Sequence, residues 1–226
     1  MLQLLPLVVL ASGAPLQHLG PVATGSVRVV LIRHGQALSN LDPTPDLPPD
    51  KLDHLTDLGR EQSRRAAEAL RAATIARIYS SPASRAQETA GEIAKLLGER
   101  APSVTVDRRL RSLDLGRKAS GEPLDWDARI ADWEAGRDPV PSAGESLEQV
   151  GQRVLDLVLS SRKAHAGRTI VLVAHSEVIG SFLGQLGGVP GPKRYPPKIA
   201  NGSLTVVEAG PQGKPRVLLE NWVAAP

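Results

Sequence analysis

Apolar residues follow two different spacings along the chain, and the two spacings alternate. Short runs of aliphatic and β-branched residues, such as SVRVVLI at 26–32 and TIVLVA at 169–174, are typical of strands buried in a parallel sheet. Between such runs lie longer segments whose apolar residues recur with helical spacing. Strands are predicted at 26–32, 76–80, 103–106, 169–174, 204–208 and 217–222, and helices at 59–73, 82–97, 126–133, 147–158 and 177–186.

Two of the predicted helices carry a capping signal at their start. Ser81 followed by Pro82 resembles an N-cap and a first helical residue, so this helix is predicted to begin at Pro82. Ser146 followed by Gln149 fits a capping box, in which each side chain bonds the backbone N–H of the other residue.

The order strand, helix, strand, helix after residue 25 predicts an α/β fold, a three-layer α/β/α sandwich around a mostly parallel central sheet. Two stretches interrupt that order and are predicted to be mainly loops. These are 42–53, which is rich in Pro and Asp, and 107–143, whose apolar spacing is irregular. No internal repeat or interdomain linker is visible, so residues 26–226 are expected to form one domain.

Residues 1–25 precede this domain and have two interpretations. The apolar run 2–10 and the small residues after it resemble the core of a secretion signal, but the run is too short to span a bilayer. No Lys or Arg precedes the run, and Pro15 would suit cleavage just before it poorly. We expect a cytoplasmic protein with an N-terminal extension and no stable membrane anchor; export through a signal in residues 1–14 is the alternative.

Composition narrows the functional classes. The chain has 226 residues, of which 41% are hydrophobic and only 3% aromatic, so few side chains could stack on nucleic-acid bases. A net charge of +3 is too close to balance for a dedicated nucleic-acid binder, but it is compatible with small anionic substrates. The lack of Cys excludes thiol nucleophiles, thiolate zinc sites and disulfide scaffolds. The apolar spacing shows no heptad repeat, so the sequence does not indicate an oligomeric state.

Two histidines follow buried strands directly. His34 lies in Arg33-His34-Gly35 at the end of the strand 26–32, and His175 ends the strand 169–174. A single histidine at such a place is usually a hydrogen-bonded surface residue. Ligands of α/β sheets bind beyond the carboxyl ends of the strands, so two histidines at that edge point to a functional site.

Arg85 is expected at the same edge of the sheet, because it follows the strand 76–80 in the first turn of the next helix. The guanidinium groups of Arg33 and Arg85 would match the oxygens of a phosphoryl group, and the helix N-terminus would add N–H donors. A neutral imidazole between two such arginines is a plausible nucleophile toward phosphorus.

Five segments of the chain, in order, resemble the histidine phosphatase superfamily in its phosphoglycerate-mutase-like branch. The resemblance covers about residues 27–208. Its motifs are Leu31-Ile32-Arg33-His34-Gly35; Leu55-Thr56 with Gly59 and Gln62; Ser80-Ser81-Pro82 with Arg85-Ala86 and Thr89-Ala90; Pro141 with Gly144-Glu145-Ser146; and Val171-Leu172-Val173-Ala174-His175.

This resemblance implies a mechanism. His34 would become phosphorylated and then be released by water, while Arg33, Arg85 and His175 would bind the phosphoryl oxygens, assisted by Asn40. It implies neither a cofactor nor a metal, since arginines and histidines supply the electrostatic stabilisation that Mg²⁺ gives elsewhere. The expected partner is a small phosphorylated metabolite.

The chain departs from the family at its usual general acid. The family's Glu in L-x-E-x-x-x-G aligns with Ser112, and a serine cannot protonate an alkoxide leaving group as a carboxylic acid does. Asp114 is one candidate replacement, because in an extended segment it would point to the same side as Ser112. Glu177, two residues after His175, is the other, similar to the His-Ala-Glu of some acid-phosphatase members. The absence of any dedicated acid is the third interpretation.

Three functions follow from these residues. The leading hypothesis is a metal-independent phosphatase for small phosphomonoesters; a phosphoglycerate-type mutase and a catalytically weak phospho-ligand-binding module are the alternatives. The sequence also contains two charged clusters. The aspartates of the loop 42–53, Asp53 among them, are expected to be solvated rather than to hold a cation. The basic residues between 108 and 118 are either surface charge or a grip for further anionic groups of the substrate.

Overall fold

In the computed structural model, which describes residues 15–195 and 199–225, the centre of the molecule is a six-stranded sheet in the order β3-β2-β4-β1-β5-β6. Strands β1 to β4 run parallel to one another, whereas β5 pairs antiparallel with both β1 and β6, so the sheet is mostly parallel as predicted. The strands are β1 Val27–Arg33, β2 Ile75–Ser80, β3 Val104–Val106, β4 Thr169–Ala174, β5 Leu204–Ala209 and β6 Arg216–Trp222.

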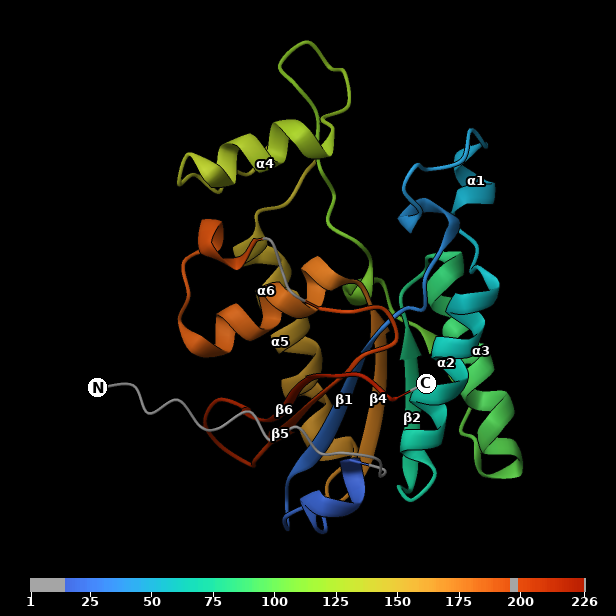
Figure 1. Ribbon diagram of the computed structural model, residues 1–226. Coiled ribbons are helices and arrows are strands. Elements are labelled where there is room, and N and C mark those ends of the chain that lie inside the picture. The colour runs from blue at the N-terminus through green and yellow to red at the C-terminus, as the bar shows by residue number, and fades with distance from the viewer. Residues whose placement is uncertain (1–14, 196–198, 226) are drawn as a thin grey trace.

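Helices cover both faces of this sheet (Figure 1). Helices α2 (Asp57–Leu70) and α3 (Ser84–Leu97) pack on one face, and α5 (Leu147–Ala164) and α6 (Ser176–Gly187) pack on the other. Alternate residues of β1 and β4 enter the two apolar cores, as the period of a strand requires. The predicted three-layer α/β/α sandwich is therefore confirmed.

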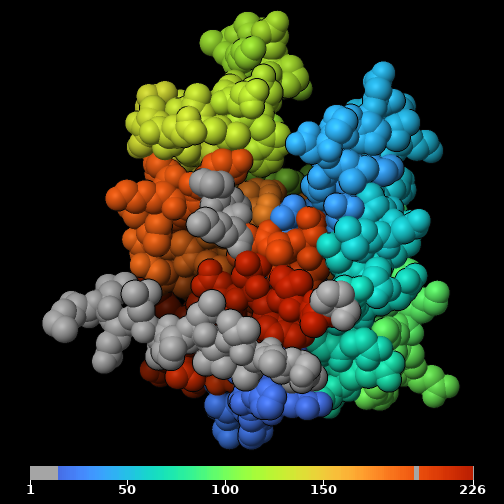
Figure 2. All heavy atoms as spheres, viewed as in Figure 1, coloured from blue at the N-terminus to red at the C-terminus, as the bar shows by residue number. Residues whose placement is uncertain are grey.

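Shorter elements stand above the carboxyl ends of β1 and β4, with α1 (Pro49–Leu52) on one side and α4 (Trp126–Glu134) with the loop before it on the other (Figure 1). A hollow opens between these two segments in the space-filling view (Figure 2). Five 3-10 helices complete the secondary structure of the described residues: Pro15–Leu19, Leu38–Asn40, Gly98–Arg100, Arg108–Leu110 and Gly191–Arg194.

One predicted helix start is confirmed and another is wrong. At α5, Gln149 N–H donates to Ser146 Oγ and Ser146 N–H donates to Gln149 Oε1, each at 3.1 Å, which is the expected capping box. Helix α3 begins at Ser84, with Ala83 as its N-cap residue, and not at Pro82. Ser81 Oγ accepts from Ala83 N–H at 3.3 Å in the turn before the helix, and it also bonds a histidine of the site described below.

The N-terminal signal hypothesis concerns residues 1–14, which lie outside the described residues. Within 15–195 and 199–225, no helix combines the length and the apolarity that crossing a bilayer demands.

The turn after β1 is packed directly on the start of α2 through two glycines. A Cβ on Gly35 would lie 2.1 Å from the Gly59 carbonyl oxygen, and a Cβ on Gly59 would lie 2.0 Å from the Gln36 carbonyl oxygen. Backbone cannot yield as a flexible side chain does, so both positions require glycine. This contact fixes the turn that carries His34 against α2.

We expect Gly59→Ala to lower the free energy of unfolding by about 1–3 kcal/mol, the usual cost of overpacking a tight contact. Chemical denaturation would measure the loss. Gly91→Ala is the matched control: Gly91 lies within α3 and a Cβ there meets nothing within 4 Å. That variant should be neutral or slightly stabilising, since Ala is the better helix former. Equal effects of the two substitutions would refute the role of the glycine contact.

Candidate active site

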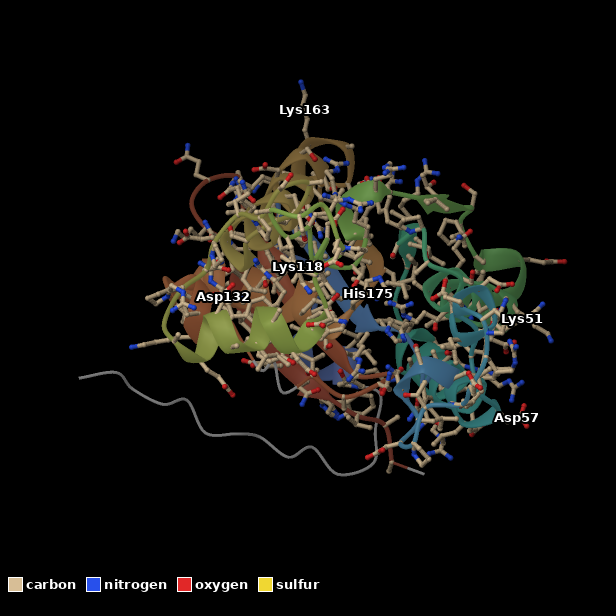
Figure 3. All side chains as sticks on the ribbon, turned by 90° about the horizontal axis from the view of Figure 1, so that it is seen from above. Lys51, Asp57, Lys118, Asp132, Lys163 and His175 are labelled. Atoms are coloured by element: carbon tan, nitrogen blue, oxygen red, sulfur yellow. The ribbon has the colours of Figure 1, made fainter. Side chains whose placement is uncertain are left out.

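His34 and His175 meet at the carboxyl ends of the neighbouring strands β1 and β4, which are paired through Arg33 and Ala174. Their ring centroids are 5.1 Å apart and the rings are inclined by 64°. Both side chains are buried, with 3% and 1% of the residue exposed. In the view from above, His175 lies near the middle of the molecule (Figure 3). The predicted meeting of the two strand-end histidines is confirmed.

The acceptor nitrogen of His34 is Nε2. Its Nδ1 lies 2.8 Å from the Gly35 carbonyl oxygen, which can only accept, so Nδ1 carries the proton. Its Nε2 accepts from Arg85 Nε at 3.1 Å. Burial, then the nearby His175 and Arg85, hold the pKa of His34 well below its usual value, so the ring stays neutral. A neutral imidazole of this tautomer can attack through Nε2.

His175 has the opposite tautomer. Arg85 donates to its Nδ1 at 3.0 Å, so its proton lies on Nε2, which donates to Ser81 Oγ at 2.8 Å. Burial, followed by Arg85 and Arg153, lowers the pKa of His175 well below the usual value. The sequence singled out Ser81 as a helix cap and gave no signal of this contact.

These two lowered pKa values make stability depend on pH. The unfolded chain binds protons at both histidines near the ordinary value of about 6.5, while the folded chain does not, so stability falls as pH decreases below that value. The expected slope is at most about 1.4 kcal/mol per pH unit for each histidine. Denaturation curves between pH 7 and 5 would measure it, and His34→Ala should reduce the slope. An unchanged slope would contradict the assignment.

Arg85 is held in place from the loop before α2. Asp53 forms an ion pair with the Arg85 guanidinium, and its other oxygen accepts from Ser84 N–H at 2.6 Å. The interpretation of Asp53 as a solvated loop residue is therefore wrong. The segment around α1 folds back onto the start of α3, which no spacing of apolar residues indicates. Within the described residues, no group of three or more His, Asp or Glu is placed to hold a metal ion.

Arg33 and Asn40 lie beside His34. Arg33 donates to the Ile199 carbonyl at 2.7 Å, and its buried Nε has no partner among the described residues. Burial lowers the pKa of Arg33, while Glu177 opposes that shift. Asn40 Oδ1 accepts from Ala37 N–H, and Asn201 donates to both Asn40 Oδ1 and the His34 carbonyl. Asn201 was not foreseen from the sequence.

Glu177 and Ser112 meet at this site although 65 positions separate them. Ser112 Oγ donates to Glu177 Oε1 at 2.6 Å, and Ser176 Oγ donates to Oε2 at 3.3 Å. Glu177 lies in the first turn of α6 and is 6% exposed. A carboxyl group thus contacts the position from which the family's usual acid is missing.

Asp114 has different surroundings. It is exposed, and its Oδ1 accepts from Gly116 N–H at 3.1 Å, a bond within its own loop. The Asp114 side chain bonds Gly116, whereas the Ser112 side chain bonds Glu177. The two side chains therefore have different partners, although an extended segment would point them to the same side.

The segment that carries Ser112 is fixed by two residues of the α5 region. Arg153 donates to the Arg111 carbonyl at 2.8 Å and pairs with Glu145 at 3.0 Å. Glu145, from the Gly-Glu-Ser turn before α5, also pairs with Arg111 at 2.6 Å. Burial lowers the pKa of Arg153, and Glu145 opposes that shift. Sequence reasoning missed Arg153, because nothing distinguishes it from a solvated helix arginine.

Residues 29–222 match the model of the histidine phosphatase superfamily (branch 1). The chain belongs to this superfamily. It is 30% identical over 190 residues to a probable phosphoglycerate mutase GpmB of Yersinia enterocolitica, covering 80% of this chain and 85% of that one. It is 36% identical over 176 residues to a glucosyl-3-phosphoglycerate phosphatase of Mycolicibacterium vanbaalenii, covering 72% and 75%.

Solved structures agree with this histidine phosphatase fold. YhfR of Bacillus stearothermophilus superposes with a TM-score of 0.69 at 28% identity, over 87% of this chain and 98% of that one. A mycobacterial glucosyl-3-phosphoglycerate phosphatase in complex with VO3 gives 0.65 at 28% identity, over 90% and 100%. Relatives named in this superfamily are phosphatases or mutases, so the protein is an enzyme.

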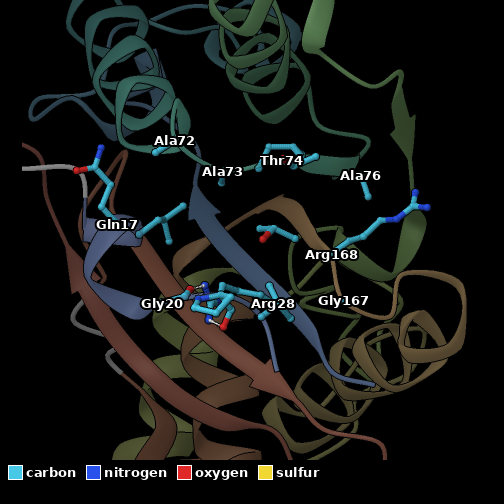
Figure 4. A pocket seen from close by; sticks show the side chains of 14 residues that line it. Gln17, Gly20, Arg28, Ala72, Ala73, Thr74, Ala76, Gly167 and Arg168 are labelled. Carbon is cyan, nitrogen blue, oxygen red and sulfur yellow. Dashed lines mark hydrogen bonds between the residues drawn. The ribbon is translucent and has the colours of Figure 1, made fainter. Parts of the chain in front are cut away.

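Two cavities differ in their relation to His34 and His175. One of about 530 Å³ is lined by Ser81 and Ser112, the hydroxyl partners of His175 and Glu177. Another, of about 820 Å³, lies at the opposite end of the sheet (Figure 4). The charged residues of its described lining are Arg28 and Arg168, and Arg28 already pairs with Glu208 at 3.0 Å. The first cavity is the one that adjoins the site.

Proposed function

We propose that this enzyme hydrolyses small phosphomonoesters through a phosphohistidine on His34. The observation that carries the proposal is the neutral Nε2 of His34, which accepts from Arg85 while Nδ1 is held by the Gly35 carbonyl. A phosphate entering there would displace the Arg85–histidine contacts and receive the guanidinium donors itself. The Nε of Arg33, for which residues 15–195 and 199–225 offer no partner, is a further donor at this site.

The first step forms one bond and breaks one. His34 Nε2 attacks phosphorus, the bond from phosphorus to the ester oxygen breaks, and Arg33, Arg85 and His175 stabilise the charge of the transferring group. We assign the proton for the leaving oxygen to the carboxyl group of Glu177. In the second step water attacks phosphorus, its proton passes to the Glu177 carboxylate, and the bond to His34 breaks.

Glu177 is favoured over Asp114 as the acid by burial and contacts. The Glu177 carboxyl is buried and held by two hydroxyls, whereas Asp114 is exposed and bonded within its loop. Positioned acids act through fixed geometry, so the held carboxyl is the better candidate.

The test is phosphate release from a panel of esters in the presence of EDTA, beside an assay for conversion between phosphoglycerate isomers. Release of phosphate supports the phosphatase. Isomer conversion without release would support the mutase, the activity named for the Yersinia relative. Binding of phosphate without either reaction would replace both by the ligand-binding module.

A further inference from the structure

Asn201 lies in the turn before β5, beside the end of β1 that carries the site. Gly202 N–H donates to the Arg33 carbonyl at 3.0 Å, and Arg33 N–H donates to the Ser203 carbonyl at 3.3 Å. Gly202 has a φ of 69°, in the left-handed region that favours glycine. The backbone after Asn201 is therefore fixed against the strand end at which His34 lies.

The His34 carbonyl determines how the Asn201 amide is oriented. The amide lies 3.0 Å from this carbonyl oxygen, which can only accept, so the atom that faces it is Asn201 Nδ2. The amide nitrogen carries a second N–H, which donates to Asn40 Oδ1 at 3.3 Å. Asn201 thus connects the backbone of His34 to the side chain of Asn40.

The Asn40 amide is oriented in turn by two donors. Ala37 N–H, which can only donate, lies 3.0 Å from Asn40 Oδ1, and the Asn201 amide supplies the second donor. The Asn40 backbone N–H also donates to the Ala37 carbonyl at 2.8 Å. Rotating the Asn40 amide by 180° would set donors against donors and lose both bonds to Oδ1. Asn40 Nδ2 is therefore held on the side away from Ala37 and Asn201.

Asn40 Nδ2 keeps its two N–H donors available for a ligand. Among residues 15–195 and 199–225, the side-chain bonds of Asn40 are those at Oδ1. Asn40 is exposed, and it shares the Asn201 donor with the His34 carbonyl, so its amide lies beside the strand end of the site. Fixed amide N–H groups stabilise anionic oxygens, and a phosphoryl group brings such oxygens to this strand end.

We propose that Asn201 is a positioning residue for phosphoryl transfer, which holds the Asn40 amide so that Asn40 Nδ2 donates to an oxygen of the phosphoryl group at His34. Asn201 does not contact the substrate and acts through Asn40. Its contribution is preorganisation, because the donor has its orientation before the anion binds. This inference rests on the proposed function, since it takes the phosphoryl group to be transferred to His34.

A double-mutant cycle on Asn40 and Asn201 tests the proposal. The probe is orthovanadate, an analogue of the transferring phosphoryl group, and its inhibition constant is measured beside kcat/KM. We expect Asn40→Ala and Asn201→Ala each to weaken vanadate inhibition and to lower kcat/KM by about tenfold, since a bond to a charged group is lost or misdirected. The double variant should lose at most about twofold more than Asn40→Ala, because Asn201 acts through Asn40.

Asn221→Gly is the control for a disturbance of the turn. Asn221 Oδ1 accepts from Ala200 N–H at 2.8 Å, and its φ of 49° accommodates glycine. This variant should keep the vanadate inhibition of the wild type. A loss as large as that of Asn201→Ala would trace the effect to a loosened turn and overturn the inference.

A second variant keeps the cycle usable if Asn201→Ala fails to fold. Asn201→Asp has the size of the amide but cannot donate to Asn40 as a carboxylate. Its added charge acts in both the Asn40 and the Asn40→Ala background, so that effect cancels in the cycle.

The outcomes separate the inference from the function on which it rests. Losses that multiply in the double variant, or no loss in either single variant, would overturn the inference while hydrolysis stands. If the wild type releases no phosphate from any ester, the proposed function fails. Calorimetric titration with inorganic phosphate then completes the same cycle. Losses of affinity that multiply there, or no binding of phosphate by the wild type, would reject the inference.

Discussion

Replacement of His34 by alanine is expected to lower the kcat of phosphate release from every ester by at least about 10⁴-fold. The variant lacks the Nε2 that accepts from Arg85 while the Gly35 carbonyl holds Nδ1, and the other histidine, His175, has its two ring nitrogens bonded to Arg85 and Ser81. The measurement is phosphate release with EDTA present, together with an alkaline quench that preserves a phosphohistidine.

His165→Ala is the matched control for this experiment. His165 bonds the Tyr79 hydroxyl at 3.3 Å at the end of α5 and takes no part in the site. Its replacement should leave turnover and the trapped phosphoenzyme unchanged. A His34→Ala protein that still forms a phosphoenzyme would show that the nucleophile is another residue.

Replacement of Glu177 by glutamine is expected to have an effect that depends on the leaving group. An alkyl phosphate needs a proton on its departing oxygen, so its kcat should fall by about 10²–10⁴-fold. The p-nitrophenolate ion leaves without help, so p-nitrophenyl phosphate should lose only a few-fold. Glutamine keeps the size of the side chain and can still accept from Ser112, which now contacts Glu177 at 2.6 Å. Steady-state kinetics on the two esters measures the difference.

Asp114→Asn is the companion variant, because it removes the other candidate carboxyl. We expect it to leave turnover of both esters nearly unaffected, since the Asp114 carboxylate is exposed and accepts from Gly116 N–H in its own loop. If Asp114→Asn, and not Glu177→Gln, lowers kcat for the alkyl phosphate far more than for p-nitrophenyl phosphate, the general acid is Asp114. If Glu177→Gln lowers kcat equally for both esters, Glu177 does not transfer the proton and has a binding or structural role.

Part of this protein was determined by the sequence alone. The two apolar runs predicted to be buried strands form β1 and β4, and both strands are buried. The predicted capping box at Ser146 begins α5. Because the carboxyl ends of neighbouring parallel strands share one edge, the positions of His34 and His175 after those strands were sufficient to place them together. The motifs around them indicated the superfamily that the comparison confirms.

The contacts that hold the site were decided by the tertiary structure. Four of these contacts join segments that are far apart in the chain. They are Asp53 with Arg85, Ser81 with His175, Arg153 with the Arg111 carbonyl, and Ser112 with Glu177. Local spacing predicts the elements because it reflects the period of a strand or helix. It carries no information on the path of a loop. The segments around α1 and before α4 have no such period, so only the folded chain determines which of their side chains reach the histidines.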